Sequence, residues 1–151
     1  MKLVRHGLVF LFSSYLSLAY LVGCARFHPI IFSNEACIKP LKGYDYRTCD
    51  IMRVKIDGKK YTVPKNFKTD LASIPRFLWP ILAPQYSGFV APAILHDYLY
   101  RCDPNVTRLF ADEVLYSALI TENVTAFTAS KFYMAVRLFG ETHFELHHGE
   151  C

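Results

Sequence analysis

The sequence predicts an α+β fold, in which a small antiparallel sheet with a β-hairpin packs on a layer of about three helices. Apolar and basic side chains alternate in the first half of the chain, which is the period of a strand with one buried face. From residue 93 onward the apolar side chains recur at helical spacing instead. Because the chain has no internal repeats or low-complexity tracts, we expect one domain over residues 24–151.

The β-hairpin is predicted over residues 51–64. Residues 51–56 (IMRVKI) alternate, Asp57-Gly58 supplies a two-residue turn, and residues 60–63 form the returning strand. Alternation around Asp-Gly is the strongest short-range signal of a hairpin. A further strand is expected near residues 44–48.

The segment from residue 64 to residue 92 is expected to be mostly loop. It contains five prolines, and proline removes a backbone donor and fixes φ, so it interrupts both helices and strands. One short helix fits around residues 77–82.

Three helices are predicted, at residues 93–101, 108–121 and 126–139. We place Pro92 near the start of the first, because proline fits the first turn of a helix. Asn105 or Thr107 is expected to cap the second helix, and Gly140 to end the third. Short connections make neighbouring helices pack antiparallel.

The first 23 residues have the pattern of a bacterial lipoprotein signal peptide. Lys2 and Arg5 precede an apolar stretch over residues 7–22, and the stretch ends in Leu21-Val22-Gly23-Cys24. We therefore predict cleavage before Cys24 and lipidation of its thiol. An uncleaved anchor is the alternative, although a span needs about 20 apolar residues.

The predicted anchor determines the expected location of the protein. The residue after Cys24 is Ala25 and not Asp, which by resemblance to bacterial lipoproteins indicates the outer membrane. The domain would face the periplasm and contact the membrane through its lipid.

The mature domain is close to neutral. Removal of residues 1–23 leaves 128 residues, enough for a single core. The removed part carries two of the 17 basic residues and none of the 13 acidic ones, which leaves a net charge near +2. Such a balance gives no electrostatic footprint for nucleic acid, so we predict no nucleic-acid partner.

Four cysteines remain after Cys24, an even number for an oxidising compartment. They allow three pairings. Closeness in the chain favours Cys37 with Cys49, and the remaining pair is Cys102 with Cys151. No paired CxxC zinc motif is present.

Two titratable side chains fall on apolar faces of adjacent predicted helices. On the first helix His96 lies between Leu99 and Tyr100 in projection, and Asp112 lies within an apolar arc of the second. A carboxylate on a core-facing stripe is costly unless it is paired or bound to a metal. We therefore expect His96 and Asp112 to face each other, which would orient the imidazole and raise its basicity, as a general base for water requires.

Two further aspartates are candidates for a divalent cation, calcium or zinc. Asp97 follows His96 on another face of the helix, and Asp70 lies in the preceding loop, where it either caps backbone amides or ligates a metal with Asp97. Three C-terminal histidines also have spacings that a metal could use, but we expect that end of the chain to fray. They are His143, His147 and His148. Tyr100 and Arg76 are expected to be structural.

Three ordered motifs carry a resemblance to a known family. The stretches VPKNFKTDLASIPRFLW, APAILHDYLY and RLFADEVLYSAL resemble the family called domain of unknown function 1353, found in phages, prophages and bacteria. The resemblance covers roughly residues 51–140. The positions that match the pattern of the family are Asp70, Ser73, Pro75, Arg76, His96, Asp97, Tyr100 and Asp112.

One position departs from the family pattern. Asn66 stands where the family usually has glycine. Asparagine is the non-glycine residue that best tolerates positive φ, so we expect the turn to survive. The family implies no established activity.

A looser resemblance links the predicted helix pair to secreted phospholipases A2. Those enzymes are similar in placing His-Asp and then Tyr on one helix and an Asp on the antiparallel helix. The resemblance implies that His96 activates water, that Asp112 orients the imidazole of His96, and that Asp97 binds calcium. The sequence lacks the glycine-rich calcium loop and the cysteines around the His-Asp, which puts the calcium site in doubt.

Two functions remain open from the sequence. The first is a metal-assisted hydrolase of the envelope, acting on a lipid ester or a cell-wall bond with the help of the His96–Asp112 pair. The second is a non-enzymatic phage or prophage envelope lipoprotein, in which the same pair only holds the fold together. Protein partners are not indicated.

Overall fold

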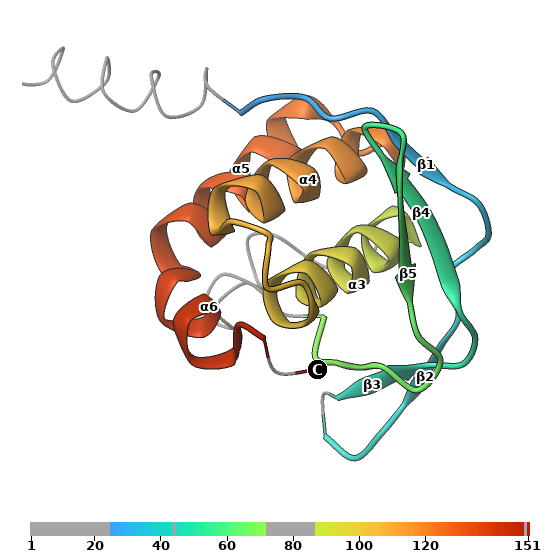
Figure 1. Ribbon diagram of the computed structural model, residues 1–151. Coiled ribbons are helices and arrows are strands. Elements are labelled where there is room, and N and C mark those ends of the chain that lie inside the picture. Colours follow the sequence, from blue (N-terminus) through green and yellow to red (C-terminus); the bar gives the residue numbers. More distant parts are fainter. Residues whose placement is uncertain (1–24, 44, 72–86, 150) are drawn as a thin grey trace, which may run out of the picture.

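The computed structural model describes residues 25–43, 45–71, 87–149 and 151 (Figure 1). The predicted signal peptide, Cys24 and the short helix expected near residues 77–82 lie outside these ranges. The described residues form two three-stranded antiparallel sheets and four helices, so the predicted α+β class is confirmed.

The first sheet contains the predicted hairpin. Its strands, in spatial order, are β1 (Ile30–Phe32), β4 (Met52–Ile56) and β5 (Lys59–Val63). Residues of β4 alternate between buried and exposed, as the sequence pattern predicts. Asp57 and Gly58 both have positive φ, 50° and 80°, which is the turn that matches the twist of a two-residue hairpin.

The second sheet is smaller and adjoins the end of the hairpin away from its turn. It contains β2 (Ile38–Pro40), β3 (Tyr46–Thr48) and β6 (Lys68–Thr69), in that order. The strand expected near residues 44–48 is β3. The sequence did not reveal β1, β2 and β6, because strands of two or three residues are too short to show an alternating pattern.

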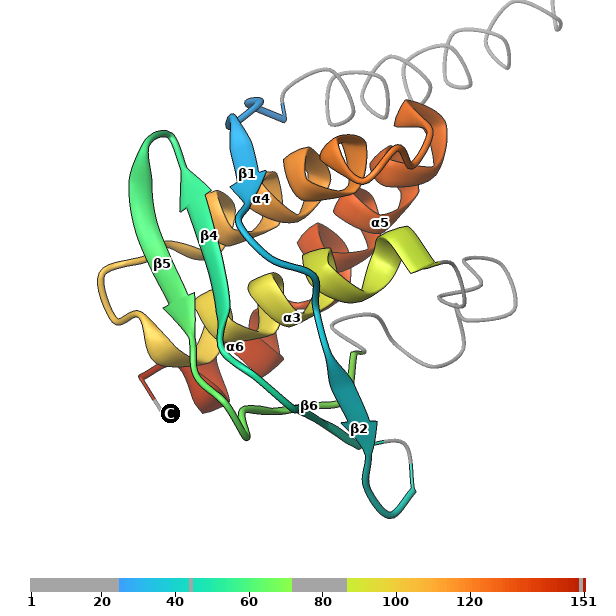
Figure 2. The same ribbon diagram turned by 90° about the vertical axis from the view of Figure 1, so that its right-hand side faces the viewer.

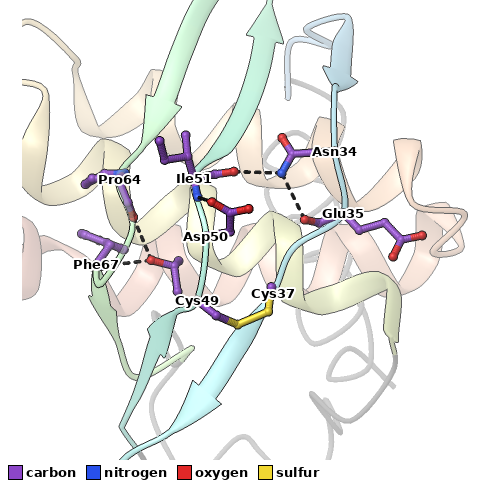
Figure 3. The surroundings of a disulfide bond; sticks show 9 residues. Asn34, Glu35, Cys37, Cys49, Asp50, Ile51, Pro64 and Phe67 are labelled. Atoms are coloured by element: carbon purple, nitrogen blue, oxygen red, sulfur yellow. Dashed lines mark hydrogen bonds between the residues drawn. A yellow bond between two sulfur atoms is a disulfide. The ribbon is translucent and has the colours of Figure 1, made fainter.

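A disulfide fastens the start of β2 to the end of β3 (Figure 3). It joins Cys37 to Cys49, as predicted. Next to it, Asn34 donates to the carbonyl of Ile51 at 2.8 Å and accepts from the backbone N–H of Arg53 at 2.9 Å. These contacts hold the chain between β1 and β2 against the edge of the hairpin.

The hairpin passes into β6 through a turn at Asn66. This residue has φ 65°, the left-handed conformation expected from the sequence. The Thr48 hydroxyl donates to the carbonyl of Pro64 and accepts from the N–H of Phe67, while the N–H of Asn66 donates to the carbonyl of Thr48. The turn therefore directs β6 across the end of α3.

The helices are α3 (Ser87–Cys102), α4 (Arg108–Thr121), α5 (Ala126–Phe139) and α6 (Glu141–His147). The bounds of α4 and α5 are those predicted, and Thr107 caps α4 by accepting from the N–H of Phe110. The sequence did not predict α6, a helix of seven residues that follows Gly140.

The prediction for α3 was wrong at its start. The helix begins six residues before residue 93 and contains Pro92 in its interior. Proline usually ends a helix because it lacks an N–H and crowds the preceding turn. Here the first turns bury Phe89 and Ala91, and this tertiary packing offsets the local cost.

The core has two parts that meet along α3 and α4 (Figure 2). In the first, Val54 and Val63 of the sheet pack on Leu95 and Leu99 of α3. In the second, aromatic and aliphatic side chains fill the space among α3, α4 and α5; they are Phe89, Leu115, Leu119, Phe132 and Val136. None of the described helices is long and apolar enough to cross a bilayer.

Candidate functional site

His96 and Asp112 meet in the centre of the helical layer. Nε2 of His96 on α3 lies 2.9 Å from Oδ1 of Asp112 on α4, and both side chains are fully buried. The helical periodicity predicts this contact, because each residue lies on the apolar face of its helix and the two helices pack side by side. Whether the pair is catalytic stays a prediction.

Asp112 has two further partners that complete its hydrogen bonding. The Tyr100 hydroxyl donates to Oδ1 at 2.6 Å, and Nη1 of Arg137 on α5 donates to Oδ2 at 2.8 Å. Burial would raise the pKa of Asp112, but hydrogen bonds from His96, Tyr100 and Arg137 outweigh it and hold that pKa below its ordinary value. The carboxylate is therefore charged and paired.

Arg137 is a site residue that the sequence analysis missed. Its contact with Asp112 joins residues 25 positions apart on different helices, and nothing local in the sequence marks it. It supplies a permanent positive charge beside Asp112, and its own pKa is raised by that carboxylate although burial opposes the shift. Arg137 thus contributes to balancing the charge of Asp112.

Neutral His96 would donate from Nε2 to Asp112 and present a lone pair at Nδ1. Among the described residues, Nδ1 of His96 is a buried side-chain atom without a hydrogen-bond partner. A buried acceptor without a hydrogen-bond partner lowers the stability of the folded protein by about 1–3 kcal/mol. Native proteins keep few such atoms, and catalytic roles are one reason for keeping them.

A polar pocket of about 270 Å³ lies beside this pair. It is lined by Asp45, Lys68, Thr69, Asp70, Asp97, Arg101, His143 and His147. Asp97 and Asp70 therefore share a pocket, as the sequence suggested. His96 and Asp112 are not among the described residues that line it.

A hydrogen bond from a residue of β6 holds the side chain of Asp97 in place. The hydroxyl of Thr69 donates to Oδ2 of Asp97 and accepts from the N–H of Leu71 at 3.0 Å. Thr69 thus ties the end of the second sheet to α3. Side chains that border the pocket come in this way from three elements far apart in the sequence.

The C-terminus does not fray as expected but forms α6 over the pocket. Cys102 and Cys151 form the predicted disulfide, which returns the chain end to the end of α3. His148 Nδ1 lies 2.9 Å from the carbonyl oxygen of Tyr100. These contacts place His143 and His147, one helical turn apart, on the pocket wall.

His143 is within electrostatic reach of the other site residues. Partial burial lowers its pKa, the nearby His147 and His96 lower it further, and Asp97 and Asp70 oppose the shift. The spacing of the two histidines was visible in the sequence. The Cys102–Cys151 disulfide was also predicted, but the expected fraying of this end was wrong, because residues 141–147 form a helix.

The residues around the pocket include donors suited to a divalent cation. Aspartate oxygens suit calcium, and a mixed set with histidine suits zinc. In the described ranges, however, no three or more His, Cys, Asp or Glu side chains are arranged to hold a metal ion. Of the family-pattern positions, Ser73, Pro75 and Arg76 lie outside these ranges.

Comparisons with known proteins agree with the motifs. The family model described as "Protein of unknown function (DUF1353)" matches residues 48–136. An uncharacterized protein, y4iH, of Sinorhizobium fredii is 31% identical over 93 residues, which are 60% of this chain and 38% of that protein. No solved structure matches. The family match covers more than half of the chain, together with both helices that carry His96 and Asp112, and the chain belongs to the DUF1353 family.

Proposed function

We propose that the protein is a hydrolase of the bacterial envelope, tethered through a lipid on Cys24, in which His96 activates a water molecule. The observation that carries this proposal is the pairing of His96. Its Nε2 is engaged by a fully buried carboxylate, while its Nδ1 is buried without a partner among the described residues. That arrangement leaves one basic atom of the ring available for a proton.

The reaction requires a water molecule to reach the fully buried Nδ1 of His96, which does not itself line the pocket. Nδ1 would then accept a proton from this water as its oxygen attacks an acyl carbon. The imidazolium that forms is stabilised through its Nε2–H by Oδ1 of Asp112, and Arg137 and Tyr100 hold this carboxylate in place. When the tetrahedral intermediate collapses, the proton passes from Nδ1 to the leaving oxygen or nitrogen. Water is consumed, and one acid and one alcohol or amine are released.

Asp97 and Asp70 are the residues that would hold a divalent cation, calcium or zinc, with water or substrate in its remaining positions. Both carboxylates border the same pocket, and Asp97 adjoins His96 on α3. Such a cation would stabilise the negative charge that develops on the acyl oxygen. Apo and metal-loaded thermal melts test it, because a ligand of the native state raises the unfolding midpoint.

The envelope location rests on the amino-terminal sequence. Leu21-Val22-Gly23-Cys24 follows an apolar stretch with a basic start. Lipidation of Cys24 would leave the domain on the periplasmic side of the outer membrane, an oxidising compartment in which the two disulfides persist.

A non-enzymatic lipoprotein of phage or prophage origin is the second candidate. The observation that favours it is Arg137, because the Arg137–Asp112–His96 contacts join α5, α4 and α3 in one network. A network of this kind stabilises a helical layer without any reaction. The two candidates differ in the effect of His96 on hydrolysis.

The experiment that separates them measures hydrolysis by the full lipidated protein. Phosphatidylethanolamine–phosphatidylglycerol vesicles and purified cell-wall sacculi serve as substrates, and newly released groups are quantified with calcium, zinc or EDTA. The hydrolase proposal expects product with one substrate, reduced at least 100-fold in His96→Asn. His28→Asn is the matched control, because His28 is also a buried histidine between carboxylates but lies in another network. Absence of product, or equal loss in both variants, contradicts the proposal.

A further inference from the structure

We infer that the pocket faces away from the membrane that holds Cys24, and that its substrate is a charged, water-soluble cell-wall peptide and not a lipid of that membrane. The inference rests on the proposed lipid anchor and hydrolase activity and specifies their substrate. Four observations carry it: the docking of the amino-terminal segment, the shortness of the tether, the position of the pocket and its lining.

The segment that follows Cys24 is docked on the body of the protein. The N–H of Arg26 donates to Glu113 at 3.1 Å, and the N–H of His28 donates to the Ser117 hydroxyl at 2.9 Å. The ring of His28 is buried, with Nδ1 2.6 Å from Asp57 and Nε2 3.2 Å from Glu113. Residues 26–28 are therefore held along α4 and beside the β4–β5 turn.

This docking leaves almost no free chain between the lipidated cysteine and the folded domain. Only Ala25 separates Cys24 from Arg26, and two residues of extended chain span at most about 7 Å. The lipidated Cys24 must lie at the bilayer surface. The face that holds Arg26 must therefore lie there too, unless the docked segment is pulled away from Glu113, Ser117 and Asp57.

The pocket lies at the opposite end of the hairpin from this face. Asp57, beside His28, is in the turn, and β5 runs from there for five residues, which is about 17 Å at the rise of a strand. Beyond its far end come Lys68 and Thr69, which line the pocket. In both views the β4–β5 turn and β1 lie near one end of the molecule, and α6 and the carboxyl terminus lie near the other (Figures 1 and 2).

The anchored face and the lining of the pocket also differ in chemistry. At the anchored end, Phe27 is 52% exposed, and Leu109, one helical turn before Glu113, is 47% exposed. Exposed apolar side chains next to a lipid anchor suit the bilayer interface. At the other end every described lining residue of the pocket is charged or polar, and no aliphatic side chain lines it.

Charges of both signs in the pocket match a peptide substrate. Lys68 and Arg101 bring positive charge to the pocket wall, which suits carboxylates, and three aspartates bring negative charge, which suits amines. Arg101 is held in position, since Nη1 donates to the carbonyl of Lys68 at 2.8 Å and the guanidinium lies over the ring of Phe67. The stem peptides of the cell wall carry carboxylates and amines on one chain, and the bond broken would be an amide.

Orientation is tested without any activity assay, by labelling amines with a membrane-impermeant reagent. The lipidated protein is labelled in vesicles and in detergent, and each lysine is quantified by mass spectrometry. Lys59 and Lys60 follow the anchored turn, whereas Lys65 and Lys68 follow β5 toward the pocket, and all four are exposed. We expect vesicles to reduce labelling of the first pair at least threefold relative to the second. Equal protection, or greater protection of Lys68, overturns the orientation.

The substrate is tested by comparing hydrolysis of sacculi with hydrolysis of the phospholipid vesicles. We expect peptide fragments from sacculi and at least 100-fold less product from vesicles. Phospholipid cleavage that disappears in His96→Asn overturns this inference but leaves the proposed hydrolase intact. Hydrolysis that is unaffected by His96→Asn instead contradicts the proposed function. Failure of Cys24 to take up a fatty acid removes the anchor on which the orientation depends.

Discussion

The imidazole of His96 on α3 lies 2.9 Å from the carboxylate of Asp112 on α4, and neither side chain is exposed. Arg137 balances the charge of this carboxylate from the other side. The pair therefore differs from an isolated buried ion pair, because removal of His96 still leaves Asp112 with a cationic partner. This difference determines what substitutions should do.

His96→Asn should have a modest effect on stability. Asparagine can keep one hydrogen bond in a similar volume, and Tyr100 and Arg137 still satisfy Asp112. We expect the free energy of unfolding in urea to fall by about 1–2 kcal/mol. A loss of 3–5 kcal/mol, typical of a broken buried ion pair, would mean that the pair is chiefly structural.

Asp112→Asn should be far more costly and should depend on pH. At neutral pH it leaves Arg137 without its carboxylate, and we expect a loss of about 3–5 kcal/mol. The pKa of Asp112 is lower in the folded than in the unfolded protein, so its contribution is fully present above the ordinary value of 3.8 and is lost as the pH falls through the folded value.

The difference between wild type and Asp112→Asn should therefore shrink below about pH 3.8. Urea unfolding at a series of pH values measures it. Asp57→Asn is the control, because Asp57 also contacts a histidine but its side chain is 42% exposed. A difference that stays constant into acid would contradict the assigned charge state.

Asn66 provides a test of backbone strain. With φ 65°, it occupies a conformation that glycine adopts freely and β-branched residues avoid. Asn66→Gly should leave the free energy of unfolding unchanged or slightly higher, and Asn66→Val should lower it by about 1 kcal/mol or more. Thermal melts of the two variants check this, and equal midpoints would refute the argument.

The Cys102–Cys151 disulfide should determine whether α6 stays on the pocket. The bridge closes a separation of 49 residues, for which chain entropy gives about 4 kcal/mol. No residue of α6 is fully buried, and its packing on the core is through partly buried side chains such as Phe144. In Cys102→Ser/Cys151→Ser we expect fast hydrogen exchange over residues 141–147.

The matched control for α6 is Cys37→Ser/Cys49→Ser, which removes a bridge that lies beside β2 and β3. It should leave exchange in α6 slow. Protection of α6 that persists without Cys102 and Cys151 would show that the disulfide does not hold the helix.

Cys24→Ser should abolish lipid attachment, because both the lipid and the cleavage depend on the thiol. In cells fed radioactive palmitate, wild type should be labelled and the variant should remain an unlabelled precursor or a soluble protein. Wild type without label would mean that residues 1–23 are not a lipoprotein signal.

The parts of the fold that the sequence predicted are those with long periodic patterns. The hairpin at Asp57-Gly58, α4 and α5 each repeat one period over ten or more residues. The start of α3 was misplaced because burial of Phe89 overrides the local cost of Pro92. Short strands such as β6 carry no period of their own; β6 pairs with β3, and hydrogen bonds of Thr48 and Thr69 fix its two ends.

The residues of the candidate site also differ in whether the sequence could predict them. His96 and Asp112 were predictable because a polar residue on an apolar stripe is conspicuous. Arg137 was not, because it lies on a third helix and its contact arises from packing between helices. The disulfide that holds the chain end near His143 was predicted, but the helix α6 that places His143 on the pocket wall was not.

The most direct test of the account is hydrolysis of cell-wall sacculi in water enriched in ¹⁸O, with wild type and His96→Asn proteins of verified fold. If His96 activates water, the peptide fragments released by wild type carry one ¹⁸O atom in the new carboxyl group, and His96→Asn releases at least 100-fold fewer. Fragments without the label, no fragments from wild type, or equal release by both proteins would contradict the account.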